Sequence, residues 1–308
     1  MQRSFRFESS DFTSASSNRN WQHHVTLELL DKALTHDMMS GVVNGAQWFR
    51  QADLWFRANH GYNNPLNFGS VNSELDMLHL NSTKIGDLLG SRSLVIMGVG
   101  VGDTESAIVD YQLERNKRSK VTGIDINPVF LRLFESSLRH RASDLNTIID
   151  YIPINNFFES LVTNDVRSSD RQDPRIALVC LGSTIGNFAA VEDIFSIFKE
   201  LTIPEDLLLI TYQLDTHLES IFRRYSTNDL YLDLISNYLD PSVRQQVVWN
   251  LDRSCGLVEA YYDQKQIFRS RKFAMADLDQ TAQDYGFYQK FIFIDSYRNL
   301  CLQAFLRS

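Results

Sequence analysis

The sequence predicts an α/β fold, with a doubly wound, mostly parallel sheet and a second lobe beside it. Three observations support this prediction. An apolar run at residues 94–97 leads into the alternating glycines Gly98, Gly100 and Gly102, which is typical of a buried strand, a tight turn and a helix. Strand-like and helix-like segments then alternate up to residue 212. The final segments, 287–295 and 299–306, predict a closing antiparallel hairpin.

The composition fits a large globular chain and argues against several classes of function. Of the 308 residues, 44% are apolar, so a full core can form. The formal net charge of -8 argues against a general nucleic-acid binder, because phosphate contacts require a basic surface. Cys180, Cys255 and Cys301 show neither metal-ligand spacing nor a disulfide framework, so a cytoplasmic setting is expected. No signal peptide and no membrane-spanning run is expected either.

The first 90 residues precede the glycine strand and divide into two parts. Residues 1–20 are polar and rich in Ser and Asn, which predicts a mobile tail. Residues 21–90 are predicted to be the N-terminal helical part of a substrate lobe, because apolar positions recur at helical spacing over 21–56 and over 73–89. The intervening stretch 60–70 is dense in turn-forming residues and is either a connector or a wall of a site.

Residues 91–212 are predicted to form the α/β core that binds a cofactor. The predicted strands are residues 94–97, 120–124, 148–154, 176–181 and 207–212. Helices are predicted from Thr104, from Pro128 and over 191–198. Pro128 suits a first helical turn, because its φ is already helical and its missing N–H has no partner there in any case.

The regular alternation stops after residue 212. Residues 213–273 are predicted to be an inserted substrate lobe, with a helix over 215–239 and strands at 246–249, 256–262 and 266–273. Residues 274–308 are predicted to return to the core, with a last helix over 274–285 and the closing hairpin. The insertion and the N-terminal helices are together expected to form a lid.

The glycine turn predicts a nucleotide-like ligand. Gly98, Gly100 and Gly102 can adopt positive φ and carry no Cβ, so a ligand can lie against the backbone. The following helix points free N–H groups at the same place. The dinucleotide fingerprint is Gly-x-Gly-x-x-Gly, and Asp103 stands where its third glycine should be. The spacing therefore favours S-adenosylmethionine (SAM) over a nicotinamide dinucleotide.

Two further stretches suit an adenosine. Asp125 ends the second predicted strand, where a carboxylate can accept hydrogen bonds from both ribose hydroxyls; the alternative is a helix cap. Asn156 and Phe157 follow the third strand, where an amide suits the edge of adenine and a ring suits its face; the alternative for Phe157 is a core residue. These features follow the glycine turn in the order that an adenosine site requires. No metal site is expected.

The most specific stretch is Gly182-Ser-Thr-Ile-Gly-Asn187, which ends the fourth predicted strand. Ligands of open α/β sheets bind at this edge, so its glycines, hydroxyls and amide would face the reactive end of the cofactor; a capped turn is the alternative. The stretch closely resembles the histidine-specific methyltransferases of ergothioneine biosynthesis and their relatives that act on other amino acids. The resemblance runs from about residue 62 onward and is strongest here and at the glycine strand.

The resemblance implies a Rossmann-like class I methyltransferase sheet and SAM-dependent methylation of the α-amino group of a free amino acid. The residues expected to bind the cofactor are Gly98, Gly100, Gly102, Asp103, Asp125, Asn156, Phe157, Gly182 and Ser183. The residues expected to bind the substrate are Tyr62, Asn187, Tyr225, Phe268 and Ser270. Asn187 and Tyr225 are also predicted to be catalytic, because they would orient the substrate for methyl transfer.

Two positions depart from this family. Phe268 stands two residues before Ser270, where the family has a glutamate that would pair with an imidazole N–H. We therefore expect a more apolar or aromatic amino acid, or another small amine, and histidine is not assured. The alternative is that Phe268 packs in the core, in which case position 268 says nothing about the acceptor. Ile96 and Met97 stand where many methyltransferases have an acidic residue, so the methionine amino group must find another partner, such as Asp103, Ser183 or a backbone carbonyl.

Three functions remain open at this point. The first is a SAM-dependent N-methyltransferase with a small-molecule amine as its partner. The second is a non-catalytic module that binds SAM or a nucleoside on the same fold. The third is a nicotinamide-dependent oxidoreductase, which the missing third glycine disfavours. No nucleic-acid or membrane partner is expected, and the sequence does not determine the oligomeric state.

Overall fold

The computed structural model describes residues 5–7, 71–100, 102–155, 175–188, 190–227, 246–295 and 299–308. The predicted helices over 21–56 and the turn-rich stretch 60–70 lie outside the described residues.

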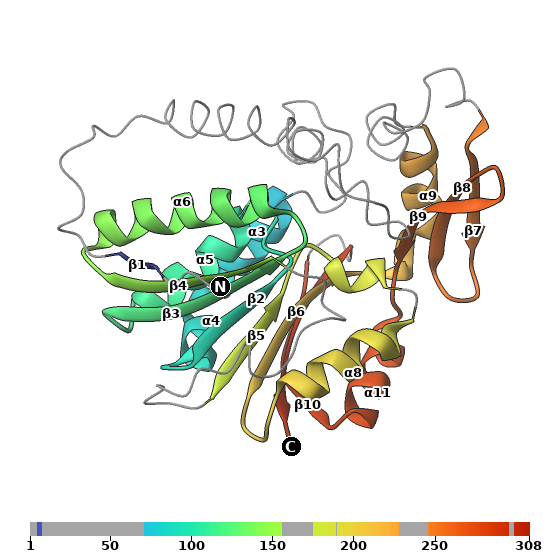
Figure 1. The fold of residues 1–308 in the computed structure, drawn as a ribbon. Helices are drawn as coiled ribbons and strands as arrows, with labels where there is room; N and C mark the ends of the chain where they lie inside the picture. Colours follow the sequence, from blue (N-terminus) through green and yellow to red (C-terminus); the bar gives the residue numbers. More distant parts are fainter. Residues whose placement is uncertain are drawn as a thin grey trace.

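Eight strands of the described residues form one sheet, in the order β1-β4-β3-β2-β5-β6-β11-β10 (Figure 1). These strands are β1 (Phe5–Phe7), β2 (Ser93–Met97), β3 (Arg118–Asp125), β4 (Ile148–Asn155), β5 (Ile176–Cys180), β6 (Leu207–Gln213), β10 (Phe287–Ile294) and β11 (Leu300–Arg307). The five strands from β4 to β6 run parallel, whereas β11 is antiparallel to both β6 and β10. The predicted doubly wound sheet with a closing antiparallel hairpin is therefore confirmed.

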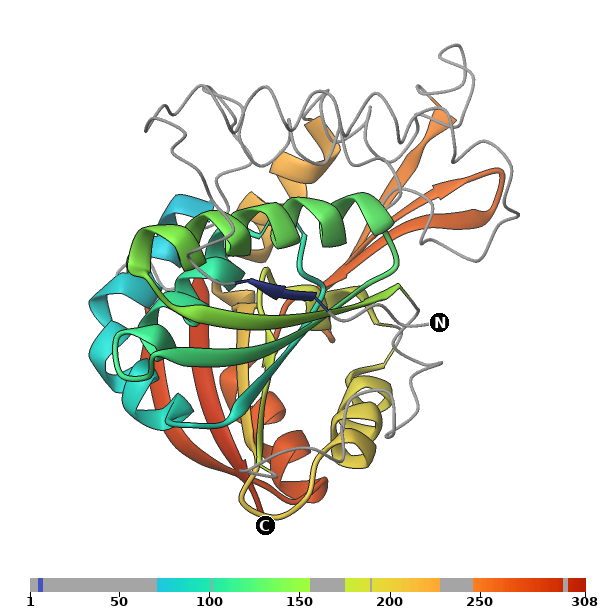
Figure 2. The same ribbon diagram turned by 60° about the vertical axis from the view of Figure 1, so that its left-hand side comes forward.

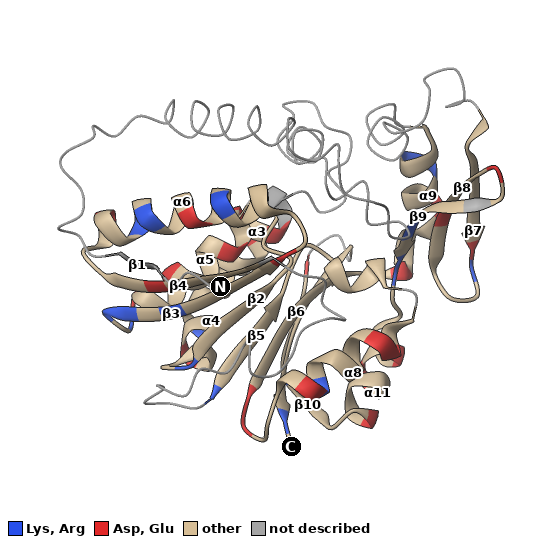
Figure 3. Ribbon diagram, viewed as in Figure 1, with Lys and Arg blue, Asp and Glu red and all other residues tan. Residues whose placement is uncertain are grey.

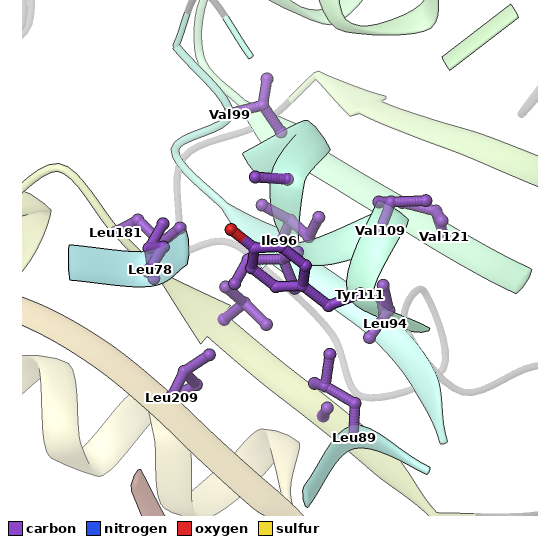
Figure 4. Close-up of a cluster of buried hydrophobic side chains, with 14 of the residues drawn as sticks. Leu78, Leu89, Leu94, Ile96, Val99, Val109, Tyr111, Val121, Leu181 and Leu209 are labelled. Atoms are coloured by element: carbon purple, nitrogen blue, oxygen red, sulfur yellow. The ribbon is translucent and has the colours of Figure 1, made fainter. Parts of the chain in front are cut away.

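Helices cover both faces of this sheet. They are α3 (Val71–Leu80), α4 (Ser82–Leu89), α5 (Asp103–Leu113), α6 (Pro128–Leu145), α8 (Val191–Leu201) and α11 (Met275–Asp284). The core accordingly divides in two. One cluster lies between the sheet and α3–α6, and Figure 4 shows part of it around Ile96 and Tyr111. The other lies under α8 and α11 and includes Phe195 and Phe287.

The central strands form because they are buried on both faces. β2, β5 and β6 contain no charged residue, and every residue in them is buried. Figure 3 shows this contrast, since red and blue residues recur along the ribbon of α6 while β2, β5 and β6 are tan between their ends. A continuous apolar run of this length is what a parallel strand between two helical layers requires.

Two N-terminal details differ from the prediction. The single helix expected over 73–89 is divided at Asn81, whose side chain donates to the Met77 carbonyl at 2.8 Å and competes with the helical hydrogen bonds. Residues 5–7, placed in a tail by their composition, form β1 and pair with the edge of β4 (Figure 2). An unpaired strand edge binds an extended segment through its backbone, so side-chain composition alone does not reveal such a strand.

A second, three-stranded antiparallel sheet lies beyond the carboxyl ends of the main strands (Figures 1 and 2). It consists of β7 (Val248–Asp252), β8 (Leu257–Tyr262) and β9 (Lys265–Arg271). It follows the short η6 (Asp215–His217) and α9 (Leu218–Thr227), which begin the helix predicted over 215–239; residues 228–245 lie outside the described residues. The chain leaves and re-enters the main body at one point, where Leu214 bridges Phe273.

Among the described residues, no helix is both long enough and apolar enough to cross a lipid bilayer.

Candidate active site

The glycine turn between β2 and α5 has the backbone conformation that its glycines predict. Gly98, Gly100 and Gly102 have φ values of 72°, 49° and 87°, in the left-handed region that side chains disfavour. A Cβ on Gly102 would lie 2.9 Å from Cδ2 of Phe134, so this glycine allows α5 and α6 to pack closely. Among the residues that the structure describes, a Cβ on Gly100 would meet nothing within 4 Å. The space beside Gly100 is therefore open to a ligand.

Asp125 ends β3 directly beside this turn. Its Oδ2 accepts from the Gly100 N–H at 3.2 Å, and its Oδ1 accepts from the Asn127 N–H at 2.8 Å. Burial raises the pKa of this carboxyl to about 7. Hydrogen bonds from the backbone of Asn127, Gly100 and Ile126 lower the pKa and only partly offset the effect of burial. The helix cap, which was the alternative role for Asp125, is taken by Asn127, whose side chain accepts from the Val129 N–H at the start of α6.

The stretch from Gly182 to Asn187 forms a sharp turn and a short helix after β5. Gly182 and Ser183 both have positive φ, and η5 (Thr184–Asn187) follows at once. The Thr184 hydroxyl donates to the Leu181 carbonyl at 2.7 Å, which holds the turn closed. A Cβ on Gly186 would lie 2.6 Å from the Arg271 carbonyl oxygen, so the backbones of η5 and β9 touch. This contact places Asn187 beside the strand that carries Ser270.

A buried carboxylate, which the sequence analysis did not single out, anchors this turn. Oε1 of Glu74, on α3, accepts from the Gly182 N–H at 2.9 Å and from the Thr211 hydroxyl on β6. Burial raises the pKa of Glu74, and these two hydrogen bonds oppose that rise. Its burial could have been predicted from its position, because Glu74 stands four residues before Leu78, within the apolar stripe of a predicted helix.

A second buried acid lies near Glu74. Glu105, in the first turn of α5, is 5% exposed and accepts from the Thr104 hydroxyl at 2.9 Å. Burial, followed by the charge of Glu74, raises the pKa of Glu105 well above its ordinary value. Asp103, the first residue of α5, adds to this rise. The glycine turn and the Gly182 turn are therefore bordered by acidic groups, although Ile96 and Met97 themselves are apolar and buried.

On the second sheet, aromatic, hydroxyl and ammonium groups come together. Cross-strand register places Trp249 opposite Ala260 and Ala260 opposite Phe268, so both aromatic side chains lie on one face, and Ser270 follows two residues later. Tyr225 of α9 packs on this face, with ring centroids 5.1 Å from Phe268 and 6.2 Å from Trp249. The Tyr225 and Ser270 oxygens are 3.4 Å apart.

Lys272 completes this group, just beyond β9. Its Nζ donates to the Ser270 hydroxyl at 2.7 Å and to the Tyr225 hydroxyl at 3.2 Å. We call Tyr225, Trp249, Phe268, Ser270 and Lys272 the aromatic–lysine cluster. The sequence analysis named three of these residues and missed Trp249 and Lys272. The available signal for Lys272 was its spacing, because residues 268, 270 and 272 alternate along one strand face.

The structure thus brings together most of the predicted site residues that it describes, in two groups. Gly98, Gly100, Gly102, Asp103 and Asp125 surround the turn after β2. Asn187 lies beside the strand that carries Phe268 and Ser270, and Tyr225 packs on that strand. Tyr62, Asn156 and Phe157 lie outside the described residues, so the predicted adenine contacts and the N-terminal substrate contact stay predictions. Among the described residues, no group of three or more His, Cys, Asp or Glu could hold a metal ion.

The turn after β2 fits a nucleoside-bearing cofactor on two counts. The open space at Gly100 allows a ligand to approach the backbone, and the buried Asp125 carboxylate at the end of the next strand offers an acceptor beside that space. In an open α/β sheet, ligands bind at the carboxyl ends of the strands near the point where the strand order reverses. Here that point lies between β2 and β5, where both turns meet.

The chain is similar to known methyltransferases in both sequence and fold. Residues 67–266 match a family profile described as "Histidine-specific methyltransferase, SAM-dependent". A search of curated proteins finds no significant match. Among solved structures, the PH0226 protein from Pyrococcus horikoshii OT3 is 14% identical with a TM-score of 0.50, and the alignment covers 82% of this chain and 96% of that one. The CcbJ methyltransferase from Streptomyces caelestis is 13% identical with a TM-score of 0.50, covering 83% and 98%. At these identities the structural likeness shows the fold alone.

The sheet order, the antiparallel β11 and the glycine turn define a class I, SAM-dependent methyltransferase. The chain belongs to the histidine-specific, SAM-dependent methyltransferase family, because the profile match spans about two thirds of its length. The predicted family, the enzyme class and the SAM cofactor are therefore confirmed. The nicotinamide-dependent alternative and the non-catalytic alternative are not supported.

Proposed function

We propose that this protein methylates the amine of a free amino acid or of a similar small molecule, with SAM as the methyl donor. Histidine is one candidate acceptor among others. The observation that carries the proposal is the aromatic–lysine cluster, in which the Tyr225 hydroxyl of α9 lies 3.4 Å from the Ser270 hydroxyl of β9, the strand that touches η5. Family membership supports a small acceptor of this kind.

Within this proposal the cofactor is held by the turn after β2 and the turn after β5. Gly98 and Gly100 take the methionine part, Gly102 lets α5 begin beside it, and Asp103 and Ser183 are candidate partners for its amino group. Asp125 accepts the hydrogen bonds of the ribose hydroxyls, beside the open space at Gly100. Gly182 and Ser183 face the reactive end. When bound, SAM supplies an electrophilic methyl group on a sulfonium.

The chain's own contribution is to present the acceptor amine in line with that methyl group. Orientation of this kind can provide most of the acceleration, because a bimolecular step becomes effectively intramolecular. We assign orientation to Asn187 and Tyr225, which come from the two elements flanking the end of β9. Ser270 holds the acceptor from the β9 side. The acceptor must be the neutral amine, because an ammonium has no lone pair to attack with.

The side chain at position 268 favours an aromatic or apolar acceptor over histidine. Phe268 is 2% exposed, and its ring centroid lies 5.6 Å from that of Trp249 and 5.1 Å from that of Tyr225. Rings at these separations interact favourably and form a rigid apolar wall. A wall of this kind offers no carboxylate to pair with an imidazole N–H. Aromatic amino acids are therefore the first acceptors to test.

The test is methyl transfer from SAM labelled in its methyl group, measured across a panel of free amino acids and small amines. We expect at least one acceptor, with an aromatic amino acid ahead of histidine. The matched pair Asn187→Ala and Asn116→Ala would separate a site effect from a general one, since Asn116 lies in the loop after α5, at the opposite end of the sheet. No acceptor in the panel, together with intact SAM binding by calorimetry, would overturn the proposal.

A further inference from the structure

A lysine is buried in the middle of the aromatic–lysine cluster. Lys272 is 2% exposed, and its Nζ lies 5.1 Å from the centroid of the Tyr225 ring. Its two hydrogen bonds go to neutral hydroxyls, those of Ser270 and Tyr225. An ammonium carries three donors, so one N–H of Lys272 has no acceptor among the residues that the structure describes.

No carboxylate of the described ranges makes an ion pair with Lys272. A buried charge without a counter-charge is costly, and a protein either neutralises such a group or supplies an opposite charge. Burial lowers the pKa of Lys272, and the neighbouring Tyr225 opposes that effect. A bound anion would offset the free-energy cost of burying this charge, because it would pair with the ammonium in a site that is shielded from water.

Other members of the cluster also carry donors, and Trp249 is linked to Lys272 through the Tyr225 ring, which both residues contact. Nε1 of Trp249 is buried and has no hydrogen-bond partner among the described residues. The Ser270 hydroxyl accepts from Lys272, so its own proton is directed either to the Tyr225 oxygen, 3.4 Å away, or to a ligand. Three kinds of N–H and O–H donors therefore surround the same strand face. A ligand that supplies acceptors, and a negative charge above all, would satisfy them.

We propose that Lys272 is the cation of the substrate site and that it selects acceptors carrying a carboxylate next to the amine. This inference rests on the proposed function, in which the acceptor is a free amino acid. It adds that Lys272 recognises the carboxylate of that amino acid. Lys272 pairs with the carboxylate, and the hydroxyls of Ser270 and Tyr225 complete the hydrogen bonds. Amines that lack a carboxylate leave the buried ammonium unpaired and bind weakly.

The experiment compares each acid with its carboxamide, which has the same shape without the charge. Calorimetry on the full chain, with S-adenosylhomocysteine present, would measure binding of L-tyrosine against L-tyrosinamide and of L-histidine against L-histidinamide. For the wild-type protein we expect the dissociation constant of the acid to be about ten- to a hundredfold lower than that of the amide, which corresponds to one charged hydrogen-bonded contact. Lys272→Met should remove this preference and leave the affinity for S-adenosylhomocysteine within about twofold.

Matched variants separate charge from packing. Lys290→Met makes the same change at an exposed position of β10 and should leave the preference as in the wild type. Lys272→Arg keeps a cation and should keep part of the preference. If Lys272→Met does not fold, the wild-type protein labelled with ¹³C at the lysine Cε serves instead: the resonance that Lys272→Arg removes should move on addition of the acid and not of the amide.

The outcomes distinguish the inference from the function on which it rests. Equal binding of acid and amide by the wild type, or a preference that survives Lys272→Met, would overturn the role of Lys272 and leave amino-acid methylation standing. Absence of binding and of methyl transfer for every amino acid of the panel would instead overturn the proposed function itself.

Discussion

The glycine turn after β2, proposed to hold the cofactor, and the aromatic–lysine cluster are built in opposite ways. At the glycine turn the candidate functional groups are backbone N–H groups and one carboxylate, which come from the ends of two adjacent strands. In the cluster they are side chains from α9, from β7 and from the end of β9, spread over residues 225–272. The buried titratable groups also differ in sign, with Asp125, Glu74 and Glu105 near the turns and Lys272 in the cluster. The turn depends on local backbone geometry, and the cluster depends on how the second sheet packs.

The largest expected effect is at Asp125. Asp125→Ala removes the acceptor proposed for both ribose hydroxyls, and we expect the affinity for S-adenosylhomocysteine to fall at least a hundredfold, about 3 kcal/mol. Calorimetry measures this loss, and the melting temperature of the variant checks that it folds. Asp284→Ala, at an exposed position at the end of α11, is the matched control and should bind as the wild type does. Unchanged binding by Asp125→Ala would show that the ribose lies elsewhere.

The next largest effect concerns the cluster. Tyr225→Phe removes one hydroxyl and keeps the ring that packs on Phe268, so we expect kcat/KM for the acceptor to fall about ten- to a hundredfold. Affinity for S-adenosylhomocysteine should not change, because the proposal assigns Tyr225 to the acceptor and not to the cofactor. Tyr288→Phe, on the exposed face of β10, is the control. A fall in cofactor affinity of similar size would contradict the division of the site into two parts.

Most of the fold and about half of the candidate site could be predicted from the sequence. The strands of the core were predictable because a continuous apolar run bounded by turn residues is typical of a buried parallel strand. β2 and β5 accordingly begin and end within a residue or so of the predicted positions. The conformation of the glycine turn was predictable because Gly98, Gly100 and Gly102 are close together in the sequence, and the position of Asp125 was predictable because it ends the next predicted strand. The family resemblance added the residues of the second lobe.

The parts that were missed depend on tertiary contacts. Glu74 accepts a hydrogen bond from the N–H of Gly182, which lies 108 residues further along the chain. No local sequence pattern predicts that hydrogen bond. Lys272 looks like an ordinary surface lysine until the register of β9 and the position of α9 are known. β1 pairs with the edge of β4, a strand about 140 residues further along the chain, and three residues are too few for a sequence pattern to predict that pairing. A sequence predicts local conformation more readily than it predicts which distant side chain completes a site.

A smaller effect should follow from pH at the glycine turn. The pKa of Asp125 is raised to about 7, so the protonated form dominates below that pH in the cofactor-free protein. Because ribose hydroxyls donate to the ionised form, affinity for S-adenosylhomocysteine should rise about tenfold between pH 6 and pH 8. Calorimetry at both pH values measures this, and Asp125→Asn should abolish the rise. A flat profile for the wild type would show that the carboxyl is ionised throughout.

The same shift has a consequence for folding stability. A carboxyl with a raised folded-state pKa stabilises the fold at pH values below its unfolded pKa, and this stabilisation is lost as the pH rises through about 7. The cofactor-free protein should therefore gain more stability from Asp125→Asn at pH 8 than at pH 5, as measured by urea denaturation. A bound cofactor should reduce the difference, because its hydroxyls then stabilise the ionised carboxylate of the wild type.

The smallest expected effect is the difference in stability and in cofactor affinity between alanine variants of two glycines in the same turn. Both Gly100→Ala and Gly102→Ala impose a positive φ on alanine, which costs about 1 kcal/mol of unfolding free energy. At Gly102 the new methyl group also meets Phe134, so we expect about 1 kcal/mol of further loss by urea denaturation. At Gly100 the methyl group meets no atom of the described residues within 4 Å and enters the space proposed for the cofactor. Gly100→Ala should therefore be the more stable variant and the weaker binder of S-adenosylhomocysteine. The reverse order of affinities would mean that the cofactor does not approach the backbone at Gly100.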